Sequence, residues 1–464
     1  MPVTSASYSI TARVVLETDD PLAIGTITTA VGETSGAIIA LDIVESHEDV
    51  LIVDITANAR DEAHARSITE AIEEIPFASV RNVSDRTFLL HLHGKLEIKP
   101  KIELRNRDEL SMAYTPGVAR VSQALANEPD DAWNLTVKGN SVAIVTDGSA
   151  ILGLGNLGPV AALPVMEGKA ILFKRFADVD AWPICLATQD SDEIVRTVEA
   201  IAPSFGGINL EDIAAPRCFD IEERLKTALD IPVFHDDQHG TAIVVLAALT
   251  NALKLVDKKL PDVSVALSGT GAAGVAIAKI LNAVGVGDVV ASDSHGIVSR
   301  DRQDLDKYKR WLAENTNNRA LRGDLLDALK GADVFIGVSA PNLFEPADIQ
   351  RMASDPVIFA LANPDPEVDP TGAREHAAVV ATGRSDFPNQ INNVLAFPGV
   401  FRGALDARAR SISEDMKIAA SRAIASLVGQ DELRANYIIP SVFNPRVATE
   451  VAQAVASASE NGRR

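Results

Sequence analysis

Apolar and polar residues alternate along the N-terminal part of the chain in a pattern that predicts four strands and two helices. Residues 9–17 place Ile10, Ala12, Val14 and Leu16 on one face, as in a half-buried strand. Further strands are predicted at 37–44, 50–55 and 77–83, and helices from Pro21 onward and over 61–75, where apolar residues recur three and four positions apart. The resulting order, βαββαβ, predicts a ferredoxin-like sandwich over residues 8–85.

A second pattern begins at Val263, where short apolar runs alternate with helical periodicity. The runs at 263–267, 289–292, 334–338, 357–361 and 378–381 are typical of parallel strands that are covered on both faces. They predict a doubly wound, Rossmann-type α/β domain. Strands expected at 141–146, 170–173 and 183–187 indicate another α/β region, and the Ala-rich tail 406–458 is predicted to be helical. We therefore expect three domains, at 1–88, 89–240 and 241–464.

Composition narrows the range of partners. The chain has 464 residues, a formal net charge of −21 and a pI near 4.8, and nucleic acid is excluded because its phosphates would be repelled. Cys185 and Cys218 lack a CxxC spacing, which argues against structural zinc and a disulfide framework. Neither a secretion signal nor an apolar run of membrane-spanning length is present in the sequence, so we expect a cytoplasmic protein without membrane contacts.

Acidic residues are concentrated between Asn209 and Thr241. Glu211 and Asp212 are adjacent, and Asp236 and Asp237 follow a short apolar run. Adjacent acids repel one another, so a fold that brings them together needs a cation, and hard oxygen ligands suit Mg²⁺ or Mn²⁺. The alternative is that these acids are ordinary turn and helix-cap residues.

The segment after the first apolar run of the second pattern predicts a dinucleotide site. Its glycines permit a tight turn and a close approach of the pyrophosphate to a helix N-terminus, and an acid at the end of the next strand is placed to bind the adenosine ribose. The candidate NAD-binding residues are Gly269, Thr270, Gly271, Ala272, Ala273, Gly274 and Asp293, with Ser339 and Asn363 in loops after later strands. His295 and Arg300 lie near Asp293, so some use of NADP stays open.

Two further side chains are candidates for proton transfer. Tyr114 precedes the rigid turn at Pro116-Gly117, and Lys169 is predicted at the mouth of the strand 170–173, where burial would lower its pKa. A packed surface tyrosine and a lysine that extends its ammonium group to solvent are the alternatives. Asn392 and Asn393 carry amides that can orient a carboxylate without adding charge.

These motifs occur together in an order that resembles one enzyme family. The chain carries Tyr114-Thr-Pro-Gly-Val118, Val145-Thr-Asp-Gly148, Gly153-Leu-Gly-Asn-Leu-Gly158, Glu167-Gly-Lys169, Glu211-Asp212, His235-Asp-Asp-Gln-His-Gly-Thr241, Ala362-Asn-Pro364, Asn392-Asn393 and Phe397-Pro-Gly399. On this evidence the chain from about residue 96 to 458 resembles a malic enzyme of the shorter, prokaryotic type.

The resemblance implies roles for individual residues. Glu211, Asp212 and Asp237 would bind the divalent metal. Lys169 would be the general base and Tyr114 the general acid, while Asp236 would hold Lys169 in place. Asn363, Asn392 and Asn393 would contact the substrate. One departure concerns Ala150, where larger eukaryotic relatives carry an arginine that grips a substrate carboxylate, so another group must take that part.

The reaction implied is oxidative decarboxylation of (S)-malate to pyruvate and CO₂ with reduction of NAD. Malolactic or oxaloacetate decarboxylase activity, or a mainly amino-acid-sensing protein, are the alternatives. The βαββαβ segment, with Asp19-Asp20-Pro-Leu-Ala-Ile-Gly25 after its first strand, resembles an ACT domain, and a generic oligomerisation domain is its alternative. Both resemblances imply a homodimer or higher homo-oligomer, with an amino-acid or metabolite effector at the ACT-like domain.

Overall fold

The computed structural model describes residues 4–47 and 49–461, so the outermost residues of the first and last expected domains lie outside the described residues. The chain forms two compact units, which meet in sequence at residues 97 and 98. The second unit contains both of the α/β regions expected from the sequence. Each unit is described separately below.

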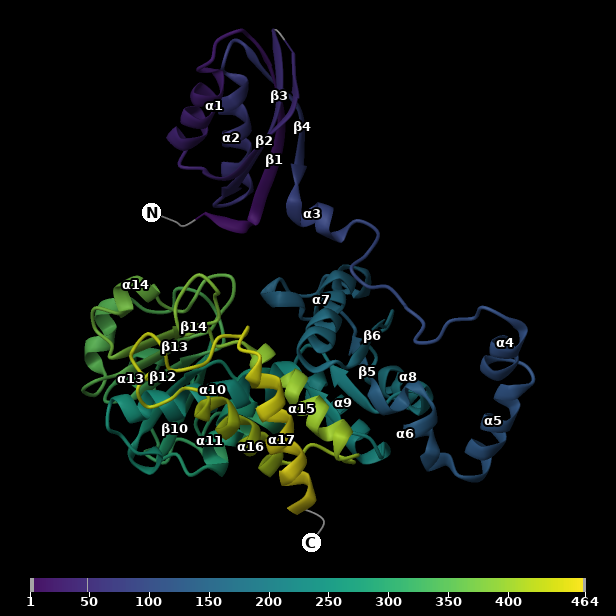
Figure 1. The fold of residues 1–464 in the computed structure, drawn as a ribbon. Helices are drawn as coiled ribbons and strands as arrows, with labels where there is room; N and C mark the ends of the chain where they lie inside the picture. Colours follow the sequence, from purple (N-terminus) through teal and green to yellow (C-terminus); the bar gives the residue numbers. More distant parts are fainter. Residues whose placement is uncertain (1–3, 48, 462–464) are drawn as a thin grey trace. The chain divides into compact units, whose positions relative to one another are not determined.

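The first unit is an antiparallel sheet with two helices on one face (Figure 1). Its elements are β1 (Ser5–Glu17), α1 (Ala23–Glu33), β2 (Ala37–Ser46), β3 (Val50–Ala59), α2 (Glu62–Glu73) and β4 (Ala78–Asp85), in the strand order β2-β3-β1-β4, followed by α3 (Arg86–His91). Asp61 caps α2 by accepting the backbone N–H of His64, and Ile68 and Ile72 turn inward from that helix. The predicted βαββαβ order is confirmed.

The second unit begins with a short helical segment and a four-stranded parallel sheet. The helices are α4 (Arg107–Ala113), α5 (Gly117–Asn127) and α6 (Ala132–Leu135). The sheet has the order β6-β5-β7-β8, with β5 (Ser141–Thr146), β6 (Asp180–Cys185), β7 (Gly207–Leu210) and β8 (Val233–His235). It is flanked by α7 (Pro159–Ala177), α8 (Ser191–Ile201), α9 (Arg217–Ala228) and α10 (Asp236–Leu255).

The strand predicted at 170–173 is wrong, because these residues lie inside α7. Met166, Ala170, Phe173 and Ala177 are all buried, and their spacing of four, three and four residues is that of one helix face. A run of four apolar residues does not distinguish a strand from a buried helix segment, and the longer spacing decides. Lys169 therefore lies on a buried helix rather than at a strand end.

The second sheet has six strands in the order β11-β10-β9-β12-β13-β14, all parallel except for β11, which pairs antiparallel with β10. The strands are β9 (Ser264–Ser268), β10 (Asp288–Asp293), β11 (Gly296–Ile297), β12 (Val334–Gly337), β13 (Val357–Ala360) and β14 (Val379–Thr382). The helices are α11 (Ala272–Ala283), α12 (Lys307–Asn315), α13 (Leu325–Leu329) and α14 (Pro370–Ala373). This arrangement confirms the predicted Rossmann-type fold.

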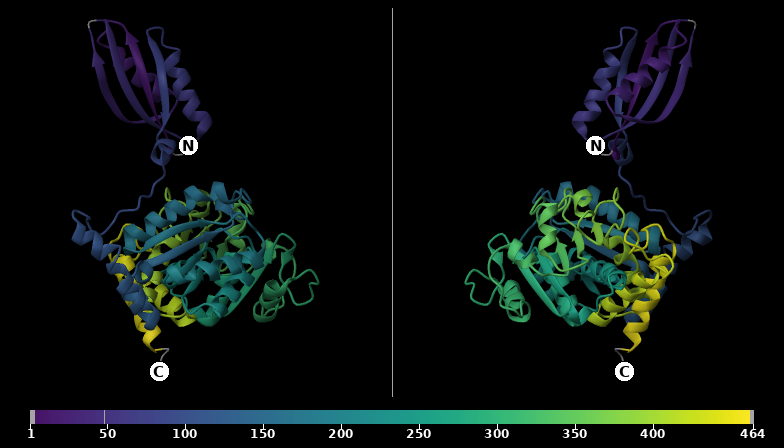
Figure 2. Two further views of the ribbon diagram at one scale, coloured as in Figure 1. Left: turned by 90° about the vertical axis from the view of Figure 1, so that its right-hand side faces the viewer. Right: turned by 90° about the vertical axis from the view of Figure 1, so that its left-hand side faces the viewer.

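The chain ends in α15 (Phe397–Asp406), α16 (Glu414–Ser426) and α17 (Arg446–Asn461), which return to the first part of the unit. α15 packs on α7, and α10 packs on both α11 and α16, so α10 joins the two sheets. Figure 2 shows these C-terminal helices in green and yellow beside the teal segments of the same unit. Within the described ranges, every helix is too short or too polar to span a membrane.

Candidate active site

Lys169 is held between two carboxylates from different strand ends. Its Nζ donates to Oε1 of Glu211 at 2.8 Å and to Oδ2 of Asp236 at 2.5 Å, and it lies 4.0 Å from the centre of the Phe397 ring. Lys169 is 8% exposed and Asp236 is fully buried. α7 supplies the lysine, the end of β7 supplies Glu211 and the start of α10 supplies Asp236. The fold thus assembles three predicted site residues that are far apart in the sequence.

The turn from β8 into α10 fixes Asp236 in this position. Asn393 donates from Nδ2 to Oδ2 of Asp236, so the carboxylate receives a second partner from the C-terminal segment. Gly240, one turn along α10, is packed against the same carboxylate, since a Cβ there would lie 1.9 Å from Oδ1 of Asp236 and 3.1 Å from Cβ of Asn393. Only glycine fits at this position, which accounts for it in the motif.

The three candidate metal ligands lie next to one another around this pair. The backbone N–H of Asp212 donates to Oδ2 of Asp237 at 2.9 Å, and Glu211 precedes Asp212 in the chain. Within the described parts of the chain, no three Asp, Glu, His or Cys side chains converge on one point that could hold an ion. Oδ2 of Asp212 and Oδ1 of Asp236 are nevertheless buried without a hydrogen-bond partner. Carboxylate oxygens without partners are the donors that Mg²⁺ and Mn²⁺ prefer, so the residues fit such an ion.

The pKa values at this site reflect burial and mutual repulsion. Burial, together with the neighbouring acids, raises the pKa of Glu211 well above its ordinary value, that of Asp212 to about 7 and that of Asp236 to about 6. For Lys169, burial acts to lower the pKa, but Asp236 and Glu211 outweigh it and raise the pKa above its ordinary value. The lowered lysine pKa expected from the sequence is therefore wrong, because that expectation counted burial without the two carboxylates.

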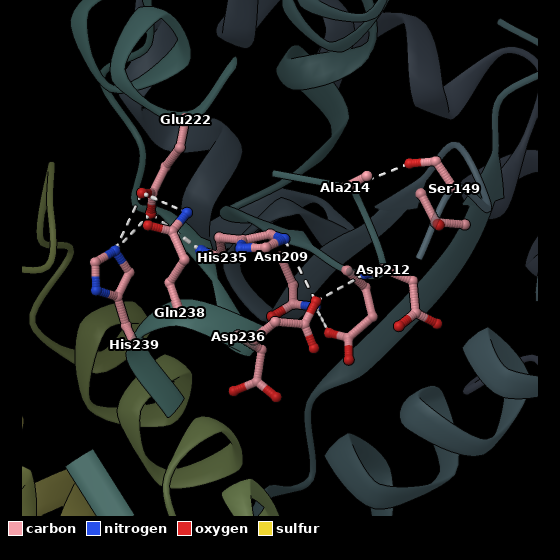
Figure 3. A network of polar contacts seen from close by, with 12 residues as sticks. Ser149, Asn209, Asp212, Ala214, Glu222, His235, Asp236, Gln238 and His239 are labelled. Atoms are coloured by element: carbon pink, nitrogen blue, oxygen red, sulfur yellow. Dashed lines mark hydrogen bonds and ion pairs between the residues drawn. The ribbon is translucent and has the colours of Figure 1, made fainter. Parts of the chain in front are cut away.

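Glu222 on α9 is a buried residue that the sequence analysis missed. It accepts hydrogen bonds from the backbone N–H of His235 at 3.1 Å and from Nε2 of His239 at 2.9 Å, and Lys226 lies 2.7 Å away. Figure 3 shows Glu222 and His239 on one side of His235 and Asp212 on the other. Glu222 thus anchors the turn that carries Asp236 from the side opposite the metal candidates.

His239 is neutral at pH 7, because burial lowers its pKa to about 4. Its Nε2–H donates to Glu222, and its Nδ1 accepts from Nζ of Lys417 at 3.2 Å, which fixes the tautomer. Lys417 belongs to α16, so this network ties the C-terminal helices to the motif. The signal in the sequence was the second histidine of His235-Asp-Asp-Gln-His239, but its partners lie in distant segments.

The glycine-rich loop between β9 and α11 has the form required by a dinucleotide. Gly269 has a φ of 110°, and a Cβ on Gly274 would lie 1.9 Å from the carbonyl oxygen of Gly269. α11 begins at Ala272 without a side-chain cap, so its first N–H groups face the loop and can bind a pyrophosphate. Thr270, Gly271 and Ala273 complete this loop, and the residues present fit NAD.

The loops after β12 and β13 lie beside this one. Ser339 Oγ is 2.8 Å from Ser268 Oγ, and the backbone N–H of Ser339 donates to the buried carboxylate of Glu367. Glu367 also accepts the N–H of Ala362, so a single side chain holds both loops. The backbone of Asn363 lies against Gly153, whose added Cβ would be 2.8 Å from the Asn363 carbonyl oxygen. The nucleotide loops therefore adjoin the glycine-rich loop after β5.

Two predicted residues are placed differently. Tyr114 follows α4 and is 68% exposed, and every residue of α4 and α5 is exposed or half-buried. Figure 1 draws these two helices at the margin of the second unit, apart from β5. Oδ1 of Asn392 accepts the backbone N–H of Val394 and so caps the short helix η7 (Asn393–Leu395). Asn393 rather than Asn392 thus contacts the lysine cluster, through Asp236.

The fold and the site together define an oxidoreductase of the dinucleotide-binding class, with a buried lysine among acids next to its nucleotide loops. The family model described as "Malic enzyme, N-terminal domain" matches residues 93–226, and that described as "Malic enzyme, NAD binding domain" matches residues 238–459. The chain belongs to the malic enzyme family.

Known relatives span nearly the whole chain. It is 56% identical to an NAD-dependent malic enzyme of Geobacillus stearothermophilus, over 98% of this chain and 95% of that protein. It is 57% identical to a bifunctional malic/malolactic enzyme of Bacillus subtilis, over 81% of this chain and 93% of that protein. The crystal structure of an NAD-dependent malic enzyme from Thermotoga maritima is similar with a TM-score of 0.78 and 50% identity, and covers 80% of this chain and 99% of that one.

Proposed function

We propose that this protein oxidises and decarboxylates malate to pyruvate and CO₂ while reducing NAD. The observation that carries the proposal is Lys169, buried between Glu211 and Asp236 and close to two further acids. NAD would accept the hydride from C2, and a divalent cation held by Glu211, Asp212 and Asp237 would polarise the hydroxyl and the later enolate oxygen and weaken the hold of Lys169 on its proton.

The chain's own residues then have the following parts. Lys169 Nζ is the group that takes the proton of the C2 hydroxyl, and Asp236 holds the amine in place through its short hydrogen bond. Asn393 fixes the orientation of Asp236, and Phe397 closes one face of the ammonium group against water. A lysine held on three sides can exchange a proton without moving far, which is what general-base catalysis requires.

The reaction is tested by the absorbance of reduced nicotinamide. Purified protein is mixed with (S)-malate and NAD, with Mn²⁺ or Mg²⁺ and then with excess EDTA, and pyruvate is measured in parallel. Equal amounts of NADH and pyruvate, lost with EDTA, are expected. NADH without pyruvate would contradict the decarboxylation, and unchanged turnover in EDTA would contradict the metal.

A second candidate is malolactic activity, favoured by the name of the Bacillus subtilis relative. In that reaction NAD stays bound and lactate is released, so no net NADH forms. Lactate measured in the same reaction mixtures decides between the two. Lactate without NADH would replace our first proposal, and both products together would indicate a bifunctional enzyme.

We propose further that Tyr114 acts in the site of a second copy of the chain. Its helical segment carries exposed apolar residues, among them Leu104, Leu110, Met112 and Tyr114, which are suited to burial against a partner. Mixing Tyr114→Phe and Lys169→Ala proteins, each inactive alone, would restore part of the activity if each site takes one residue from each chain. A mixture as inactive as its components would contradict this sharing.

The first unit is the proposed place of regulation. Its βαββαβ order and its position outside both family matches support an ACT-like effector domain. Deleting residues 1–88 should remove any response of the malate kinetics to amino acids, and an unaltered response would contradict the proposal. Both cysteines are free thiols, which supports a reducing, cytoplasmic location.

A further inference from the structure

The acid at the end of β10 has no acceptor capacity left for a ribose. Oδ1 of Asp293 accepts Nη1 of Arg302 at 2.8 Å and the backbone N–H of His295 at 2.9 Å. Oδ2 accepts Nη2 of Arg302 at 3.1 Å and Nζ of Lys309 at 2.8 Å. A carboxylate offers about four lone-pair positions, and all four are occupied. A ribose hydroxyl could bind Asp293 only by displacing one of these donors.

The charge of Asp293 is compensated as well. Burial would raise its pKa, but the hydrogen bonds from Arg302 and Lys309 lower the pKa to about 2, so the group is an anion paired with two cations. Selection of NAD over NADP by an acid at this position depends on a free negative charge that repels the 2′-phosphate. Here that repulsion is largely cancelled.

The two cations differ in what they can still donate. Arg302 uses all five N–H groups, on Asp293, Asp304 and the carbonyl of Gly296. Lys309, at 26% side-chain exposure, makes a single hydrogen bond within the described residues, and two of its three N–H groups remain available. Arg302 is therefore a fixed clamp on Asp293, and Lys309 is the cation that can turn toward a ligand.

We propose that Lys309, with Arg302 as the clamp, determines the choice at the 2′ position of the adenosine ribose and makes the site accept a 2′-phosphate as well as a 2′-hydroxyl. The inference rests on the proposed NAD-dependent function and deepens it, because it assigns a specificity residue to the nucleotide site. Arg300, which was near Asp293 in the sequence, is not that residue, since it donates to the backbone carbonyls of Ala313 and Glu314.

The test measures binding of adenine nucleotides by calorimetry, without malate or metal, so that it does not depend on turnover. The ligands are ADP, with a free 2′-hydroxyl, and adenosine 2′,5′-bisphosphate, with a 2′-phosphate. The variant is Lys309→Met. Its matched control is Lys307→Met, which removes the same charge from the same helix, where Lys307 pairs with Glu223 at 2.8 Å.

We expect the wild type to bind the two ligands within about tenfold of each other, since one charge-assisted hydrogen bond offsets the residual repulsion. Lys309→Met should weaken binding of the 2′-phosphate ligand by about tenfold or more, and leave ADP binding unchanged or tighter. Lys307→Met should leave both constants as in the wild type.

Rejection of the 2′-phosphate ligand by the wild type by more than about a hundredfold would overturn the inference. An equal loss in the Lys307→Met and Lys309→Met proteins would also overturn it, because the effect would then be one of general charge. Failure to bind ADP at all would refute the nucleotide site and with it the proposed function. Normal nucleotide binding without malate oxidation would refute the proposed function alone.

Discussion

Replacing the candidate metal ligand Asp212 by asparagine should stabilise the metal-free protein. Asp212 is 5% exposed, its Oδ2 has no hydrogen-bond partner and its pKa is raised from 3.8 to about 7. The shift of about three units corresponds to a cost of about 4 kcal/mol for holding this charge in the fold at pH 8. Asparagine has the same shape without the charge, and it tolerates the backbone φ of 53°.

The pH dependence follows from the sign of the shift. An acid with a raised folded-state pKa binds more protons folded than unfolded between pH 4 and 7, so the wild type loses stability as the pH rises through this range. The gain from Asp212→Asn should therefore grow from under about 1 kcal/mol at pH 4 to about 4 kcal/mol at pH 8.

The assay is thermal and denaturant unfolding in EDTA at pH 4.5 and pH 8, repeated with Mn²⁺ at pH 8. Asp257→Asn is the control, because Asp257 has a similar φ of 51° but is exposed, so its change should stay within about 0.5 kcal/mol. Mn²⁺ should reverse the order of the two proteins, since it stabilises the one that binds it better. A variant less stable than the wild type in EDTA at pH 8, or a gain independent of pH, would refute the reasoning.

Three further substitutions test the rest of the site. Gly274→Ala should weaken NAD binding by at least about tenfold, because its Cβ would clash with the Gly269 carbonyl, and an unchanged dissociation constant by calorimetry would contradict this. Glu367→Gln should weaken NAD binding by about tenfold, since its amide N–H would face the N–H of Ser339, and the same titration decides. Lys169→Ala should lower kcat for malate by at least about a hundredfold while NAD affinity is kept, and substantial turnover would remove Lys169 from its assigned part.

The sequence was sufficient wherever chemistry and periodicity are local. The strand, loop and helix from Val263 to Ala283 could be predicted because the apolar run, the glycines and the helical spacing are contiguous. The motif at His235 was recognised for the same reason. The four-residue run at 170–173 was misassigned because it is too short to show its period, and only the neighbouring Met166 and Ala177 reveal the helix.

Contacts between distant segments could not be predicted in this way. Lys169 meets Asp236 across 67 positions, and Asp236 meets Asn393 across 157. The raised pKa of the lysine depends on these contacts and not on its local sequence. Lys309 shows the same limit, because the sequence near Asp293 offered Arg300, whereas the fold brings a residue of the next helix to the carboxylate.

Buried acids close together in this chain have opposite pKa shifts, and the difference separates structural from chemical parts. Burial would raise the pKa of Glu222, yet His239 and Lys226 lower it well below its ordinary value, so its charge is stable without any ligand. Burial raises the pKa of Glu211 and Asp212, and a single lysine does not offset it. Incompletely compensated negative charge is therefore held at the lysine cluster, while Glu222 keeps the supporting turn rigid. A site that is costly in its free form and satisfied by a cation is the arrangement that metal-dependent chemistry on a hydroxy acid requires.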